Sequence, residues 1–316
     1  MQDPVTLQNT AIPAVLRSQP EQEPDIATKQ LSQTQLIWYR FRRHKPALFG
    51  AVLLSLIVLA AIFAQVLTPV NPYNDQTYTQ VNQDGLPSLD HWWDALGFDN
   101  SGRPMIVAII YGARISLVVG FVSAFGVSLI GVMVGAIAGY FGGWVDTVMM
   151  RVTDVFLTLP FLPILLLVAD LFGQGSLLLI IIIFVFFSWP GIARLARSSY
   201  LTLREQEFTE AARAVGVGNM RIIFRHILPN ALRPIIVATT LNIASFIVVE
   251  AAIDFLGAGL PITEVSWGLS LNDARASTAV GYWWESLTGA AIVLTVLAVN
   301  FIGDGLGDAL DVRSKG

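Results

Sequence analysis

Residues 115–140 read ISLVVGFVSAFGVSLIGVMVGAIAGY, and this stretch decides the class of fold. It contains no charged residue. A helix rises about 1.5 Å per residue, so roughly 20 apolar residues cross a hydrocarbon core about 30 Å thick. The stretch is longer than that minimum. We therefore predict a helix that crosses a membrane.

The composition of the whole chain agrees with this prediction. Of its residues 54% are hydrophobic and 13% are charged, whereas a soluble domain carries roughly 25% charged residues. Further apolar blocks that could span a membrane lie at 46–67, 145–171, 177–195, 234–256 and 286–306. The short apolar stretch 105–111 is expected to be a separate interfacial helix. The sequence predicts an all-α membrane protein with about six transmembrane helices.

The distribution of charge predicts the orientation of these spans. Positive residues next to a span favour the cytoplasmic side. Four of them stand just before the first block: Arg40, Arg42, Arg43 and Lys45. The segment 68–103 holds five acids and one arginine and is expected outside the cell, whereas 194–233 holds seven arginines and is expected in the cytoplasm. Six spans then place both termini in the cytoplasm.

Three regions follow from this orientation. Residues 1–39 are predicted to be a disordered cytoplasmic tail, because they are rich in Gln, Pro, Thr and Glu and lack an apolar run. Residues 40–104 would form the first transmembrane helix and an extracytoplasmic loop. Residues 105–316 would form a five-helix core with a cytoplasmic loop at 197–233.

The composition also excludes several classes of function. The net charge is −4 and no large basic face is present, so nucleic acid is not an expected partner. Cysteine is absent and the three histidines are scattered, which leaves no disulfide, no thiolate and no evident metal site. Only Lys29, Lys45 and Lys315 are lysines, and none ends a glycine-rich phosphate loop. Energy must therefore come from a partner or from an ion gradient.

The segment 204–216 is rich in helix formers and charge. Gly216 and Gly218 are expected to stop this helix. Asn219 would cap a second short helix, and Pro229 would end it. The pattern fits a solvated amphipathic loop and a helix–turn–helix knob for a partner equally well.

A family resemblance separates these two readings. Residues 210–216, EAARAVG, with Leu228 and Pro229 downstream, resemble the EAA motif of binding-protein-dependent ABC importer permeases; His226 departs from that motif. Similarity to the C-type permease subunit of dipeptide, oligopeptide and nickel importers extends over about 40–316. The stretches that carry it are 111–117, 139–146, 225–231 and 303–305.

The resemblance implies a type I permease bundle in the cell (plasma or inner) membrane, with a coupling helix around 205–216. It implies that this helix contacts a separate ATPase subunit through Glu205, Glu207, Glu210, Ala211, Ala212 and Gly216. ATP would be bound by two such subunits, so this chain would need no cofactor and perform no covalent chemistry. A similar second permease chain, an extracytoplasmic binding protein and membrane lipid complete the implied partners.

Two acids in the fifth apolar block are candidates for the substrate path. Glu250 and Asp254 are four residues apart and share a helix face. An ionised carboxylate inside a span costs on the order of 2.5–3.5 kcal/mol on insertion scales, so it is expected to face a cavity or a partner. The pair could line the path, or it could lie partly hydrated near the outer boundary. Further candidates for the lining are Asn242, Ser245 and Asn300.

Two packing features have simple interpretations. Gly131, Gly135 and Gly139 form one small-residue face, which favours packing within the bundle over a subunit interface. Pro160 and Pro163 are expected to kink the span at 145–171.

Two other classes of function remain open at this point. An ion-coupled secondary transporter would use Glu250 and Asp254 as proton or cation ligands. An intramembrane enzyme is disfavoured, because no His/Glu metal pair or Ser/Lys or Ser/His pair stands out in the spans. Within the resembled subgroup the cargo could be peptides, nickel complexes or another small solute.

Overall fold

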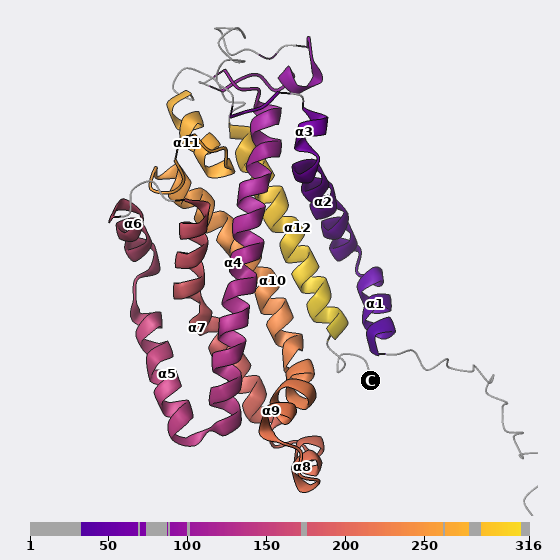
Figure 1. The fold of residues 1–316 in the computed structure, drawn as a ribbon. Coiled ribbons are helices and arrows are strands. Elements are labelled where there is room, and N and C mark those ends of the chain that lie inside the picture. The colour runs from indigo at the N-terminus through magenta and orange to yellow at the C-terminus, as the bar shows by residue number, and fades with distance from the viewer. Residues whose placement is uncertain are drawn as a thin grey trace, which may run out of the picture.

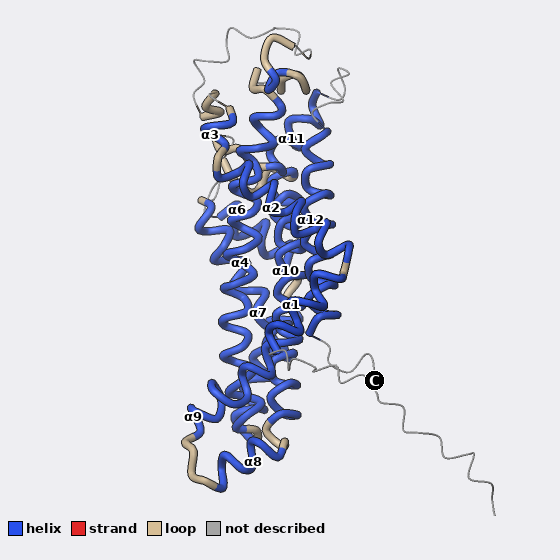
Figure 2. Tube along the Cα trace, turned by 90° about the vertical axis from the view of Figure 1, so that its right-hand side faces the viewer, coloured by secondary structure: helices blue, strands red, loops and turns tan. Residues whose placement is uncertain are grey.

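The computed structural model describes residues 33–68, 70–73, 87, 89–99, 102–171, 176–261, 263–277 and 286–310. These residues form an elongated bundle of helices (Figures 1 and 2). Its one non-helical pairing in the described ranges is an isolated bridge between Phe98 and Pro104. Five helices are long and apolar enough to cross a membrane, or six if one bent pair counts as a span. The predicted all-α class with about six spans is confirmed.

The elements follow one another in this order. They are α1 (Gln33–Arg43), α2 (Lys45–Ile62), α3 (Ala64–Leu67), η3 (Trp92–Asp94), α4 (Met105–Phe141), α5 (Gly143–Thr158), α6 (Phe161–Leu171), α7 (Leu177–Leu203), α8 (Glu207–Ala214), α9 (Asn219–Arg221), the π-helical turn η4 (Ile222–Ile227), α10 (Leu228–Phe255), α11 (Trp267–Ser277) and α12 (Leu287–Leu310). The short helices α8 and α9 lie at one end of the bundle, and α3 and α11 lie at the other (Figure 1).

Helix α4 forms the centre of the bundle, where it packs against α2, α7 and α10. Its contact with α7 depends on small residues. A Cβ added at Gly135 would lie 2.3 Å from the carbonyl oxygen of Ala193, and one at Gly139 would lie 2.7 Å from that of Arg197. The glycine face therefore packs within the chain, as favoured above.

Helix α2 packs on α12 and α4 at the side of the bundle. A Cβ at Gly50 would lie 2.5 Å from the carbonyl oxygen of Ala298, so these two helices are also in close contact. Arg114 of α4 donates hydrogen bonds to the carbonyl oxygens of Ala61 and Ile62 at 2.5 and 3.1 Å. These carbonyls lie at the C-terminal end of α2, where helical partners are lacking.

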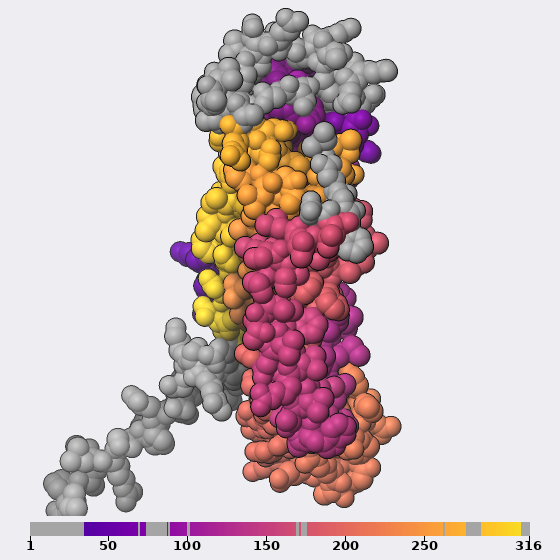
Figure 3. Space-filling view, turned by 90° about the vertical axis from the view of Figure 1, so that its left-hand side faces the viewer, coloured from indigo at the N-terminus to yellow at the C-terminus, as the bar shows by residue number. Residues whose placement is uncertain are grey.

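Helices α5 and α6 cover another side of the bundle, above the salmon-coloured segment that holds α8 and α9 (Figure 3). They are bent by 75° at a break of two residues, Leu159 and Pro160. The predicted kink is confirmed at Pro160, whereas Pro163 lies inside α6. Arg197 of α7 forms an ion pair with Asp146 of α5, and Arg194 pairs with Asp154 at 2.6 Å.

Two predicted boundaries near the N-terminus are wrong. Residues 105–111 are the first turns of the continuous α4, not a separate helix, because Arg114 finds partners on α2 and so does not end the span. Residues 33–39 belong to α1, whose Phe41 is buried against Ala309 of α12. The remainder of the predicted disordered tail, 1–32, lies outside the described residues.

The prediction that Pro229 ends a short helix is also wrong. Residues 219–255 form one continuous helical segment of 37 residues that includes η4. Pro229 lies in the first turn of α10, where its missing N–H removes little hydrogen bonding. In the π-helical turn before it, the Ile223 carbonyl accepts the Leu228 N–H and also the Tyr200 hydroxyl, the latter at 3.2 Å.

Candidate functional site: a helical knob and a buried carboxyl pair

Helix α8 is a short helix with charges that suit its ends. Glu207 and Glu210 lie in its first turn and Arg213 in its last, where they interact favourably with the helix dipole. Gly216 follows the helix with a φ of +78°. Its N–H donates to the Arg213 carbonyl at 2.9 Å, and the N–H of Val217 donates to the Ala212 carbonyl at 3.0 Å. This is a Schellman cap, so the predicted stop at Gly216 is confirmed.

The predicted roles of Gly218 and Asn219 are wrong. Gly218 has a φ of −64° and caps the start of α9 instead of ending α8. The Asn219 side chain makes no helix cap. It accepts a hydrogen bond from the Tyr140 hydroxyl of α4 at 2.8 Å, which ties the turn to the bundle.

The two alanines of the EAA motif point in different directions. Thr209 and Ala212 are buried, and Ala212 belongs to the main core cluster with Ile222 and Ile223. Ala211 is exposed, together with Phe208 at 39% and Val215 at 79%. The expectation that Ala212 lies on the partner face is therefore not met, because its position three residues after Thr209 turns it toward η4.

The outward face of α8 is apolar along its length and acidic around it. Phe208, Ala211 and Val215 form a stripe at helical spacing. Glu205, Glu207 and Glu210 are all exposed beside it. We call these three apolar residues the α8 stripe. An exposed apolar stripe of this kind is typical of a surface that meets another protein.

Side-chain contacts fix α8 to the ends of two long helices. The Thr209 hydroxyl donates to the Leu203 carbonyl at the end of α7, at 2.8 Å. The Arg213 guanidinium of α8 lies 5.3 Å from the centre of the Tyr140 ring of α4, and Arg204, at the end of α7, donates to the Gly139 carbonyl of α4 at 3.1 Å. A displacement of α8 would therefore act on both α4 and α7. These contacts were not predicted from the sequence, because none of them has a local signal.

The second candidate region is the end of α10 farthest from α8. Glu250 and Asp254 are both 0% exposed. The Ser116 hydroxyl of α4 donates to Glu250 Oε2 at 2.9 Å. Asp254 accepts the N–H of Leu260 at 2.9 Å on Oδ1 and the Ser266 hydroxyl on Oδ2. Neither of the two predicted settings, an open path or a hydrated boundary, matches this burial.

The burial arises because residues 258–261 and 263–268, which we call the cover segment, fold back over α10. Gly259 and Gly268 permit this contact. A Cβ at Gly259 would lie 1.7 Å from Asp254 Oδ1, and one at Gly268 would lie 2.6 Å from the Ala251 carbonyl oxygen. The cover segment thus has no room for a side chain against the acid.

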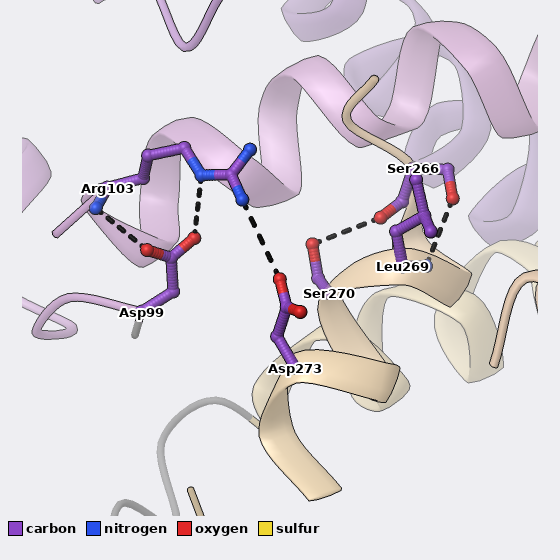
Figure 4. Close-up of polar contacts among 6 residues, drawn as sticks. All are labelled: Asp99, Arg103, Ser266, Leu269, Ser270 and Asp273. Carbon is purple, nitrogen blue, oxygen red and sulfur yellow. Dashed lines mark hydrogen bonds and ion pairs between the residues drawn. The ribbon is translucent and has the colours of Figure 1, made fainter. Parts of the chain in front are cut away.

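Further contacts hold the cover segment and α11 against α4. The Trp267 indole donates to the Ile109 carbonyl at 2.9 Å and lies against Gly112, where an added Cβ would be 2.9 Å from its ring. Arg103 pairs with Asp99 at 2.9 Å and with Asp273 of α11 at 3.6 Å (Figure 4). Ser266 also accepts the Leu269 N–H at 3.1 Å, as a cap for α11 (Figure 4).

Comparison with known proteins identifies the family. Residues 131–316 match the family model described as binding-protein-dependent transport system inner membrane component, and residues 32–87 match the N-terminal TM domain of oligopeptide transport permease C. The chain belongs to the binding-protein-dependent permease family.

Individual relatives agree with this assignment. The chain is 39% identical to the dipeptide transport system permease protein DppC of Alkalihalophilus pseudofirmus over 282 residues, which are 87% of this chain and 88% of DppC. It is 38% identical to the glutathione transport system permease protein GsiD of Shigella boydii over 303 residues, 96% of this chain and 97% of GsiD. The inward-facing MetNI methionine ABC transporter contains a chain with a similar fold, at a TM-score of 0.52 and 22% identity, over 66% of this chain and 98% of that one.

In this permease two of the three remaining path candidates, Ser245 and Asn300, lie on a groove between α10 and α12. The groove has a volume of about 490 Å³ and apolar walls with two polar side chains, Ser245 and Asn300. Asn242 is half-buried and lies outside that lining. Among the described residues of the permease, no group of His, Asp or Glu has an arrangement that could hold a metal ion.

Proposed function

We propose that this permease is the membrane-spanning subunit of an ATP-driven importer that carries dipeptides or oligopeptides. The observation that carries the proposal is the α8 stripe, an exposed apolar surface on a knob fixed to α4 and α7. The names of the relatives support peptides as the cargo, since one is a dipeptide permease and another a glutathione permease. Nickel complexes or another small solute are the alternative cargo within the same role.

The proposed assembly has four kinds of partner. Two cytoplasmic ATPase subunits bind ATP, and one of these subunits docks on α8. This chain therefore needs no cofactor and catalyses no reaction. A second, homologous permease chain completes the path, and an extracytoplasmic binding protein delivers the peptide. The α8 end of the bundle is then cytoplasmic, both termini lie on that side, and the chain lies in the cell or inner membrane.

The proposed mechanism moves helices without changing their fold. ATP binding closes the ATPase pair and displaces α8. The contacts of Thr209 and Arg213 pass this displacement to α7 and α4, which then tilt as rigid bodies and alternate access to the path. The exposed acids Glu205, Glu207 and Glu210 supply polar contacts around the stripe and steer it toward a basic groove.

The proposed path uses the groove between α10 and α12. Ser245 and Asn300 can donate and accept hydrogen bonds, so they can pair with the amide groups common to all peptides. The apolar walls accept varied side chains. A path of this kind would select the peptide backbone and tolerate different sequences.

A charge placed on the α8 stripe tests the coupling role. Val215→Asp should abolish co-purification of the ATPase subunits and substrate uptake, because it buries a carboxylate in the docking surface. Val215→Thr has the same shape without the charge and is the matched control. Membrane insertion should be unchanged in both variants, since Val215 is 79% exposed. Normal uptake by Val215→Asp would contradict the coupling assignment.

A second experiment tests the cargo. The complex that co-purifies with this chain is reconstituted in vesicles with its binding protein, and dipeptides, longer peptides and nickel complexes are compared as stimulants of ATP hydrolysis. We expect stimulation by peptides. Stimulation by nickel complexes alone would reject peptides but keep the permease role. Uptake by the isolated chain, driven by an ion gradient without ATP, would reject both.

A further inference from the structure

We propose that Glu250 and Asp254 form a buried proton-binding site. Glu250 is the neutral carboxylic acid, and its O–H group donates a hydrogen bond to the Asp254 carboxylate. The shared proton holds the cover segment on α10.

Burial without a counter-charge requires such a proton. Both side chains are 0% exposed and lie one turn apart on α10. Two buried carboxylates at this separation cannot both stay ionised unless a cation is present. Among the described residues no basic side chain forms an ion pair with either acid. Arg114 is engaged with carbonyls of α2 instead.

The groups that face the pair come from two elements besides α10, and none of these groups is charged. Ser116 faces it from α4, and Leu260 and Ser266 face it from the cover segment. These groups and the two acids themselves account for the interactions of the pair within the described chain.

Counting donors and acceptors places the proton on Glu250. Each oxygen of Asp254 already accepts a hydrogen bond, from the Leu260 N–H and the Ser266 hydroxyl, which is the pattern of an ionised carboxylate. Glu250 Oε2 accepts from Ser116, but Oε1 is buried and has no hydrogen-bond partner among the described residues. A proton on Oε1 turns that orphaned acceptor into a donor, and Asp254 is the acid that it interacts with.

The site has a mechanical consequence for the cover segment. Asp254 is the point at which Leu260 and Ser266 are bound to α10, and Gly259 and Gly268 pack directly on that region. Removal of the proton would leave two like charges beneath the cover segment. Water would then have to enter, so the segment must open. Proton binding thus stabilises the closed form.

Infrared spectroscopy of the whole complex in lipid nanodiscs tests the proton directly. Wild type should show the carbonyl band of a protonated carboxylic acid at neutral pH, and Glu250→Gln should lack it. The band should disappear at alkaline pH together with a rise in hydrogen exchange of the cover segment. Absence of the band in wild type would overturn the proposal without any variant. If the band were lost in Asp254→Asn but retained in Glu250→Gln, the proton would be on Asp254, which would contradict the assignment to Glu250.

Two isosteric variants separate the site from a general packing role. Glu250→Gln keeps a neutral donor toward Asp254, so uptake should stay within about twofold of wild type. Asp254→Asn faces the Leu260 N–H and the Ser266 hydroxyl with only one acceptor oxygen, so at least one buried donor is left unsatisfied and uptake should fall about tenfold or more. Equal losses in both variants would contradict the donor and acceptor assignment. Sodium-dependent protection of the cover segment would show that a cation, not a proton, is bound.

Discussion

The cap of α8 provides the sharpest test of the coupling geometry, through the single change Gly216→Ala. Gly216 has a φ of +78°, and an added Cβ would meet no atom within 4 Å. The cost is therefore confined to the backbone, because a left-handed conformation costs an L-residue about 1–2 kcal/mol. That energy corresponds to a roughly 5–30-fold loss of the capped conformation.

Two further variants at the same turn isolate this effect. Gly216→Asn should recover most of the loss, since asparagine tolerates the left-handed region. Gly218→Ala is the matched control, because Gly218 has an ordinary φ of −64° and equally open surroundings. Affinity for the ATPase subunits is measured by titration of the purified permease, with uptake as a second readout. We expect Gly216→Ala to bind about 5–30-fold more weakly and the other two to bind nearly normally.

The reasoning would be refuted by either of two results. If Gly218→Ala were as damaging as Gly216→Ala, side-chain bulk in the turn would be the cause and not the backbone conformation. If Gly216→Asn were no better than Gly216→Ala, the Schellman cap would not control docking. A loss of membrane insertion in Gly216→Ala would point to folding of the bundle instead of coupling.

Three other predictions follow from the packing. Ala212→Asp should destabilise the α8 knob by roughly 1–3 kcal/mol because it buries a polar group, whereas the exposed Ala211→Asp should leave hydrogen exchange normal and impair only ATPase binding. Gly135→Leu should force α4 and α7 apart and reduce the melting temperature, while Gly191→Leu, at an open position, should not. Burial raises the pKa of Asp273, and the nearby Asp99 adds to that rise. The stabilising contribution of the protonated Asp273 side chain to α11 is therefore present below pH about 4 and is lost as pH rises through the raised pKa. After correction for intrinsic rates, exchange protection of α11 should decline over that range in wild type and less in Asp273→Asn.

The spans and the α8 cap could be predicted because their signals are local. Residues 115–140 are apolar over a length that only a membrane helix explains, and Gly216 follows a run of helix formers. The continuity of 219–255 had no such signal. Pro229 reads as a helix end in isolation, but in the structure it follows a π-helical turn and starts α10.

The position of the acids required tertiary information. Their spacing of four residues correctly placed Glu250 and Asp254 on one face. Which face is buried depends on the cover segment, which returns over α10 only because Gly259 and Gly268 leave room for it. Periodicity within one helix cannot report that contact. The glycines were the available signal, and their function became clear only from the α10 residues that they contact, Ala251 and Asp254.

Two continuous helices connect the two candidate regions, and this bears on how a displacement at α8 could reach the acids. Helix α4 and the segment 219–255 each contain 37 residues, a length of about 55 Å. At one end Tyr140 of α4 bonds to Asn219, the first residue of the other segment. At the far end Ser116 of α4 bonds to Glu250 of that same segment. Because both ends are linked, a shift of one helix along the other must strain one hydrogen bond or the other. The buried carboxyl pair is thus placed where relative movement of the two helices would be felt, whereas α5 and α6, broken at Pro160, could absorb the same movement by bending.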